Sequence, residues 1–139
     1  MGTAITDLTA ALERATAVRP KVGGFPYLAE ALRQAGVSTY RCTVPAGTGV
    51  YLTGAGPVVI QAAPLVDGMA DIAPWDEAAL ITAIRSDQAG ESSYPEFVSG
   101  CWNAGVLHYE VDLAARTCTY VGVLGDSYTE SYPSVTISH

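Results

Sequence analysis

The sequence predicts an α+β fold in which two tandem ααβββ repeats form one two-layer domain, residues 1–139, with a mainly antiparallel sheet. The first observation is an ungapped internal match at an offset of 69 residues, which aligns the segment 25–51 with the segment 94–120. The second is that each segment reads as a helix, a glycine stop and two strands joined by a short turn. A match over nearly the whole chain indicates an internal duplication, so residues 4–66 and 73–135 should be related by a pseudo-twofold axis.

Two helices are expected to open each repeat. Thr3 or Thr6 can cap the first helix, which should run to about Ala17, and Asp76 or a neighbour should start the third. Proline in the first turn and glycine at the C-terminal stop mark the second helix of each repeat, with Pro26 and Gly36, then Pro95 and Gly105. A left-handed backbone conformation is expected at both glycines.

Three strands should follow the helices in each repeat. They are expected at 37–44, 50–53 and 58–62 in the first repeat, and at 107–113, 117–121 and 128–132 in the second. Successive side chains of a strand point to opposite faces of the sheet. Thr39, Arg41 and Thr43 should therefore lie opposite Tyr40 and Cys42. In the second repeat, His108, Glu110 and Asp112 should share the face opposite Tyr109, Val111 and Leu113.

Composition excludes several classes of function. The chain has 139 residues, of which 49% are hydrophobic and 15% charged, so it should fold around its own core. Its net charge of −7 is uneven: residues 1–70 have five basic and four acidic side chains, and residues 71–139 have two basic and ten acidic. An acidic chain without a basic stripe argues against nucleic-acid binding, and only the first half could attract an anion.

The chain shows no membrane or secretion signal. No apolar run approaches the roughly 20 residues that a spanning helix needs. The first 15 residues do not combine a basic start with an apolar run, so we expect a cytoplasmic protein. Cys42, Cys101 and Cys118 form no CxxC pair, and we interpret them as free thiols that act as small buried hydrophobes. Cys101 is the best candidate for a reactive thiol.

A family pattern is recognisable in the second repeat. Its residues are Gln88, Gly90, Tyr94, Ala104-Gly105-Val106, Asp112, Thr117-Cys118-Thr119-Tyr120, Glu130 and Pro133. This pattern resembles the uncharacterised family typified by the enterobacterial protein YbcV, often labelled "phage envelope protein". The resemblance covers nearly the whole chain and implies a fold without a mechanism. Val121-Gly122-Val123-Leu124 departs from the family's polar turn, which leaves open a specialised branch with its own ligand.

The candidate catalytic residues are His108, Glu110 and Arg41. An imidazole and carboxylates on one strand face, about 7 Å apart, could act as acid and base. The offset makes Arg41 equivalent to Glu110, and a pseudo-twofold axis could bring both into one cavity, with Arg41 as anion clamp and His108 titrating near neutral pH. The alternative is an ordinary polar face in water. We expect no metal and no cofactor, because no second histidine lies near in sequence.

The candidate ligand-binding residues are Tyr40, Tyr109 and Tyr120, together with Asp112. The repeat pairs Tyr40 with Tyr109 and Tyr51 with Tyr120. Tyrosine hydroxyls need partners when buried, so these side chains could line a pocket, and the alternative is core packing.

These residues lead to two main hypotheses of function. The first is a cofactor-independent enzyme, an isomerase, cyclase or lyase, whose small-molecule substrate binds at the junction of the two repeats. The second is a non-catalytic module that binds a small molecule or another protein. A phage structural role is a third hypothesis that rests on the family label. The chain has no nucleotide-binding glycine loop, no GxSxG and no HExxH, so no motif identifies a reaction.

Overall fold

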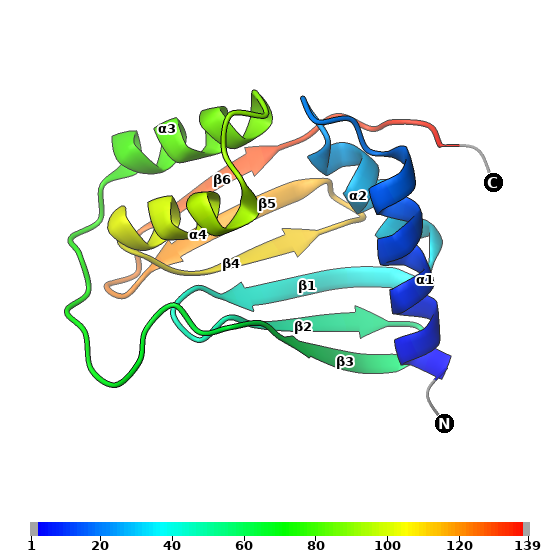
Figure 1. Cartoon of the computed structure of the whole chain (residues 1–139), viewed down its shortest axis with the longest axis horizontal. Coiled ribbons are helices and arrows are strands. Elements are labelled where there is room, and N and C mark those ends of the chain that lie inside the picture. The colour runs from blue at the N-terminus through cyan, green and yellow to red at the C-terminus, as the bar shows by residue number, and fades with distance from the viewer. Residues whose placement is uncertain (1–2, 138–139) are drawn as a thin grey trace.

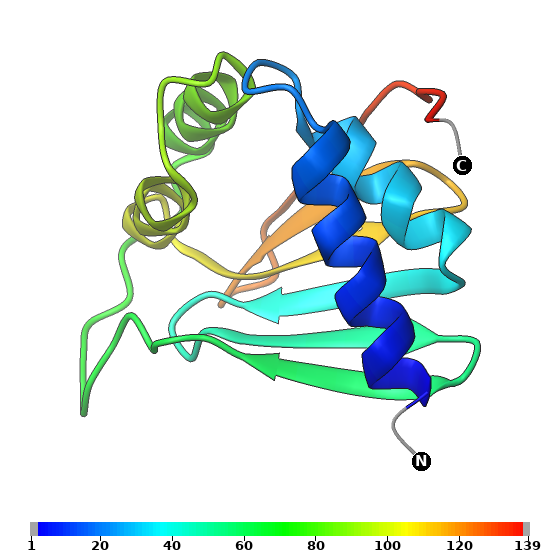
Figure 2. The ribbon, with the colours of Figure 1, turned by 45° about the vertical axis from the view of Figure 1, so that its right-hand side comes forward.

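The computed structural model describes residues 3–137 and confirms the α+β class. Its six strands form one antiparallel sheet in the order β3-β2-β1-β4-β5-β6. The elements are α1 (Thr3–Val18), α2 (Phe25–Gln34), β1 (Val37–Thr43), β2 (Thr48–Thr53), β3 (Gly56–Gln61), α3 (Glu77–Gln88), α4 (Tyr94–Asn103), β4 (Val106–Asp112), β5 (Thr117–Gly122) and β6 (Ser127–Ser131). The four helices cover one face of the sheet, which gives two layers (Figures 1 and 2).

The two halves repeat their elements at the predicted offset. α2 and α4, β1 and β4, and β2 and β5 begin and end 69 residues apart. The first helices of the two halves differ in length, with 16 residues in α1 and 12 in α3. Pro74 lies where α3 would have to extend, and a proline is poorly tolerated inside a helix. These bounds are what an internal duplication predicts, and a superposition of the halves is its direct test.

The turn chemistry follows the sequence closely. Gly36 and Gly105 follow the C-caps of α2 and α4 and have φ angles of +94° and +87°, which confirms the left-handed conformation. Asp76 caps α3 by accepting a hydrogen bond from the backbone N–H of Ala79. The third strands begin slightly earlier than predicted, because β3 already pairs at Gly56, which lies opposite Thr53 across a two-residue turn.

The two halves meet at the centre of the sheet. β1 pairs with β4 in antiparallel register, with Arg41 opposite Glu110, Thr39 opposite Asp112 and Thr43 opposite His108. Arg41 and Glu110 are 69 residues apart, so this register is the one that the predicted pseudo-twofold axis between the halves would give.

The core lies between the sheet and the helices. Its largest fully buried side chains come from both halves: Leu32, Leu80, Leu113, Val106, Val111 and Cys101. They belong to one continuous apolar cluster. Within residues 3–137, no helix covers the opposite face of the sheet (Figures 1 and 2). Arg41 and the predicted polar residues of β4 lie on this open face.

Candidate functional site

Arg41 and Glu110 form an ion pair on the open face of the sheet. Arg41 Nη2 donates to Glu110 Oε2 over 2.9 Å, and the side chains are 56% and 42% exposed. The structure thus brings together a cation from one half and a carboxylate from the other. It places them in contact with solvent, and the groove described below is lined by other residues. An exposed pair of this kind contributes little to stability.

His108 lies beside this pair, in the same strand as Glu110 and opposite Thr43 of β1. Partial burial lowers the pKa of His108 below its ordinary value of 6.5; Arg41 lowers it further, and Glu110 acts in the opposite direction. The imidazole is therefore neutral at pH 7. A catalytic role for His108, Glu110 and Arg41 stays a prediction.

Asp112 shapes the turn between β4 and β5. Its Oδ1 accepts hydrogen bonds from the backbone N–H groups of Ala114, at 3.1 Å, and Ala115, at 3.0 Å. A short Asp side chain often stabilises a turn in this way. Asp112 therefore fixes the backbone that carries Arg116, the next charged residue.

The tyrosines predicted to bind a ligand lie in the core. Tyr40, Tyr109 and Tyr120 are 5%, 7% and 6% exposed. Tyr40 stacks on Tyr51 with ring centroids 4.7 Å apart, and the hydroxyls of Tyr109 and Tyr94 are 2.8 Å apart. These contacts agree with the packing alternative, and a ligand-binding role would require the core to open.

The three cysteines are free thiols in the structure. Cys101 and Cys118 are buried, and burial raises the pKa of each thiol to about 12. A thiol with such a pKa carries almost no thiolate at neutral pH, so Cys101 is a packing residue and a poor nucleophile.

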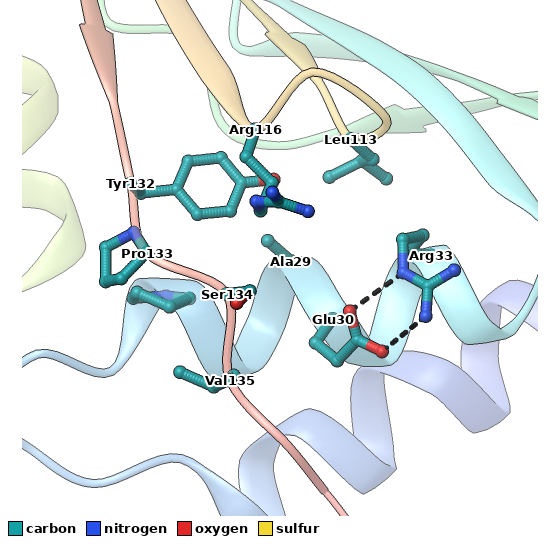
Figure 3. Close-up of a pocket in the computed structure, with 10 residues that line it drawn as sticks. Ala29, Glu30, Arg33, Leu113, Arg116, Tyr132, Pro133, Ser134 and Val135 are labelled. Atoms are coloured by element: carbon teal, nitrogen blue, oxygen red, sulfur yellow. Dashed lines mark hydrogen bonds and ion pairs between the residues drawn. The ribbon is translucent and has the colours of Figure 1, made fainter.

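A groove runs between α2 and the end of the sheet that belongs to the second repeat. Its walls are α2, the β4–β5 turn and the segment after β6, residues 133–137, which we call the C-terminal strap. This junction groove has a volume of about 590 Å³ and is lined by residues of both halves, among them Arg33, Gln34, Ser38, Ala114, Arg116 and Ser134. A cavity of about 10 Å³ adjoins it, with Ala29, Leu113, Tyr132 and Pro133 in its lining (Figure 3).

The C-terminal strap is anchored at its far end. Ile137 is 7% exposed and packs with Ala15 of α1 and Ala31 of α2. At its near end, the backbone N–H of Tyr132 donates to the carbonyl oxygen of Arg116 over 3.0 Å. The ring of Tyr132 meets the ring of Phe25 edge to face, with centroids 5.1 Å apart. These contacts hold the strap against α2, so the groove has a defined wall.

Charged side chains face each other across the groove. Glu30 is held by Arg33 through two hydrogen bonds of 2.8 and 2.7 Å, and it also accepts one of 2.9 Å from Gln34. The bond from Arg33 is the main cause of the lowered pKa of Glu30; burial opposes this change, and the nearby charge of Arg116 adds to it. Burial raises the pKa of Tyr132 to about 12, while Arg116 acts in the opposite direction. The phenol therefore keeps its proton at neutral pH.

Sequence reasoning did not identify the residues of this groove. The sequence patterns single out none of Arg33, Arg116 and Tyr132. One signal was available, because the offset aligns Arg116 with Gly47 and Arg33 with Trp102. An arginine at a turn position where the other repeat has glycine indicates a residue kept there for its side chain.

Over residues 3–137, no three His, Cys, Asp or Glu side chains are grouped so that they could hold a metal ion. Over the same range, none of the helices has the length and apolar character needed to cross a membrane.

The chain is similar to a family of unknown function and to mycobacterial proteins that are described as uncharacterized. Residues 14–130 match the model of a family described as "Protein of unknown function (DUF1398)". The chain is 50% identical over 135 residues to the uncharacterized protein Mb2035 of Mycobacterium bovis and to the uncharacterized protein Rv2012 of Mycobacterium tuberculosis. In both cases the match covers 97% of this chain and 82% of the relative.

Proposed function

This chain belongs to the DUF1398 family of proteins of unknown function, and we propose from its own geometry that it binds a small molecule in the junction groove without chemical turnover. The observation that carries this proposal is a groove of about 590 Å³ whose lining comes from both repeats. Small-molecule sites commonly have volumes of about 300–1,000 Å³ and occur where structural units meet.

The lining of the groove favours binding over catalysis. It has no histidine or cysteine among the described residues, and its one carboxylate, Glu30, is tied to Arg33. A carboxylate with a lowered pKa is a weak proton acceptor near neutral pH, so Glu30 is unsuited to act as a general base. Hydroxyl groups and arginines beside apolar side chains are suited to orient a ligand.

A cofactor-independent isomerase, cyclase or lyase using His108, Glu110 and Arg41 is the second candidate. The observation in its favour is the contact between Arg41 and Glu110 next to His108. The narrower likeness to YbcV-like proteins, the phage role that their label suggests and a cytoplasmic location are further predictions.

A thermal-shift screen of small organic molecules on the full chain tests the proposal. A ligand that binds only the native state raises the melting temperature by mass action. Ala114 and Ala115 are neighbouring exposed residues of the β4–β5 turn, and Ala114 lines the groove. Ala114→Trp should block binding of the ligands found, and Ala115→Trp is the matched control that should retain it.

Variants at the groove and at the Arg41–Glu110 pair distinguish the two candidate functions. If Ala114→Trp binds every ligand as well as the unmodified chain, the groove is not the site. If instead His108→Ala or Glu110→Gln abolishes ligand binding or an activity while the fold is intact, the sequence-based enzyme hypothesis is favoured. The groove proposal expects both of these variants to bind normally.

A further inference from the structure

Arg116 has an unusual backbone conformation. Its φ angle is +57°, and within residues 3–137 every other residue with positive φ is a glycine. Gly47, the equivalent residue of the first repeat, has a φ angle of +67°. The β1–β2 connection and the β4–β5 connection therefore both require a residue in the left-handed conformation. Glycine adopts this conformation freely, whereas an arginine bears a steric cost. Strain of this kind is often found where a side chain has a function.

The turn holds Arg116 in this conformation from both sides. The carboxylate of Asp112 orders the residues before it, and the backbone N–H of Tyr132 donates to the carbonyl oxygen of Arg116. The side chain lies beside the hydroxyl end of Tyr132, across the groove from Arg33 and Glu30 (Figure 3). A fixed backbone limits the freedom that this side chain would lose when it binds a ligand.

Arg116 acts on Glu30 only at a distance, because Glu30 is bonded directly to Arg33. The guanidinium of Arg116 makes no hydrogen bond and no ion pair with any residue between 3 and 137, whereas Arg33 is paired with Glu30. The groove lining contains two arginines and one carboxylate, which gives it a net charge of +1 in a chain whose net charge is −7. This local excess of positive charge is suited to an anion.

We infer that the junction groove binds an organic monocarboxylate, whose carboxylate group pairs with Arg116. The inference rests on the proposed function, because it names the class of ligand for the same groove. One net positive charge matches one carboxylate, and a guanidinium binds a carboxylate through two parallel hydrogen bonds. The hydroxyls of Tyr132 and Ser134 supply further donors. Val37 and Val135 line the groove beside its polar residues, and Leu113 lines the adjoining cavity, so the rest of the ligand should include an apolar part.

The experiment compares charged and neutral probes on the full chain. Hexanoate and benzoate are titrated against hexanamide and benzamide, and the amide signals of residues 114–117 are followed by NMR. The carboxylates should bind about tenfold more tightly than the amides, or better, because they alone can pair with a guanidinium. Inorganic phosphate is a separate arm, and it should bind more weakly than hexanoate because it leaves the apolar lining unfilled.

Arg116→Gly is the decisive variant, because it copies Gly47 of the first repeat. It should lose the preference for carboxylates over amides and weaken hexanoate binding about tenfold or more. The same variant should raise the melting temperature of the unliganded chain by about 3 °C, since it relieves the strained backbone. If Arg116 had only a structural role, its replacement would not weaken ligand binding while raising the melting temperature. Arg19→Ala, which removes an exposed arginine outside the groove, is the control and should bind hexanoate normally.

Several outcomes would overturn the inference. It is wrong if no carboxylate perturbs the turn amides, if the amides or phosphate bind as tightly as the carboxylates, or if Arg116→Gly binds hexanoate unchanged. A neutral ligand that Ala114→Trp blocks and Arg116→Gly does not would leave the proposed function standing and refute the carboxylate. Carboxylate binding that depends on Arg116 but persists in Ala114→Trp would place the ligand outside the groove and refute the proposed function.

Discussion

The two repeats place the same elements at the two ends of the sheet, and the charged groove lies at one of these ends. At the groove, α2 contributes Arg33 and the facing turn contributes Arg116. At the equivalent place in the other half, α4 contributes Trp102 and the facing turn contributes Gly47. Trp102 packs against the apolar core, and a Cβ on Gly47 would approach the carbonyl oxygen of Ala63 to 2.8 Å.

The same order of elements can therefore leave the space in front of the strand turn either closed or open. Near Gly47 the chain after β3 closes tightly, because Leu65 and Val66 both donate backbone hydrogen bonds to the carbonyl oxygen of Pro45. Near Arg116 the C-terminal strap is held at its two ends, by the hydrogen bond from Tyr132 to Arg116 and by the packing of Ile137, and the space between these contacts stays open. One end is thus closed by packing, and the other has the groove that we propose as a ligand site.

The largest expected effect on stability is at the two glycines that follow α2 and α4. A Cβ on Gly105 would lie 2.8 Å from the carbonyl oxygens of Ala73 and Pro74, whereas a Cβ on Gly36 would meet only Gly54, at 3.8 Å. Gly105→Val should therefore lower the free energy of unfolding by about 3 kcal/mol or more, and Gly36→Val by about 1–2 kcal/mol, from backbone strain alone. Chemical denaturation measures both. Equal losses would show that the close approach at Gly105 relaxes without cost.

The next effect concerns helix capping, where the halves again differ. Ser93 caps α4 in a capping box with Glu96, while the equivalent N-cap of α2, Gly24, has no side-chain bond. Ser93→Ala should destabilise the chain by about 1 kcal/mol, because the N–H of Glu96 loses its partner. Ser99→Ala, within the same helix, is the control and should change stability little. A similar loss for both variants would mean that the cap contributes nothing specific.

A smaller effect is expected at the centre of the sheet. A double-mutant cycle with Arg41→Gln and Glu110→Gln should give a coupling energy of about 0.5 kcal/mol, because both partners are exposed. The coupling should fall further at high salt, which screens exposed charges. A coupling above about 2 kcal/mol would contradict this account and point to a pair that is better shielded than its exposure indicates.

The smallest effect is a pH dependence from His108, whose equivalent in the first repeat is Thr39. Its pKa is lower in the folded chain than the ordinary value of 6.5, so the unfolded chain binds the extra proton first. Stability from this group is complete above pH 6.5 and declines as the pH falls toward the folded pKa. His108→Thr should flatten the decline of the melting temperature just below pH 6.5, and an unchanged slope would contradict the prediction. The carboxyl groups with a lowered pKa, such as Glu30, change the stability only at lower pH.

The fold was readable from the sequence because local signals agreed with the repeat. Proline and glycine marked the ends of α2 and α4, alternation marked β1 and β4, and the offset identified Arg41 and Glu110 as equivalent residues. The groove was not readable, because it joins α2 of one repeat to a turn and a strap of the other. No local pattern states that Arg33 and Arg116 are neighbours, since tertiary packing alone brings them together.

The pairing of β1 with β4 has a consequence for the order in which the molecule forms. Within the described residues, every other strand pairing joins strands that are adjacent in sequence, whereas Arg41 and Glu110 are 69 residues apart. Closing a loop of that length has an entropic cost of roughly 4 kcal/mol, so the halves should acquire their meanders quickly and join late. The groove exists only after this joining. A ligand held there should slow unfolding and leave the folding rate unchanged, which stopped-flow kinetics would show as a shift of the unfolding arm alone.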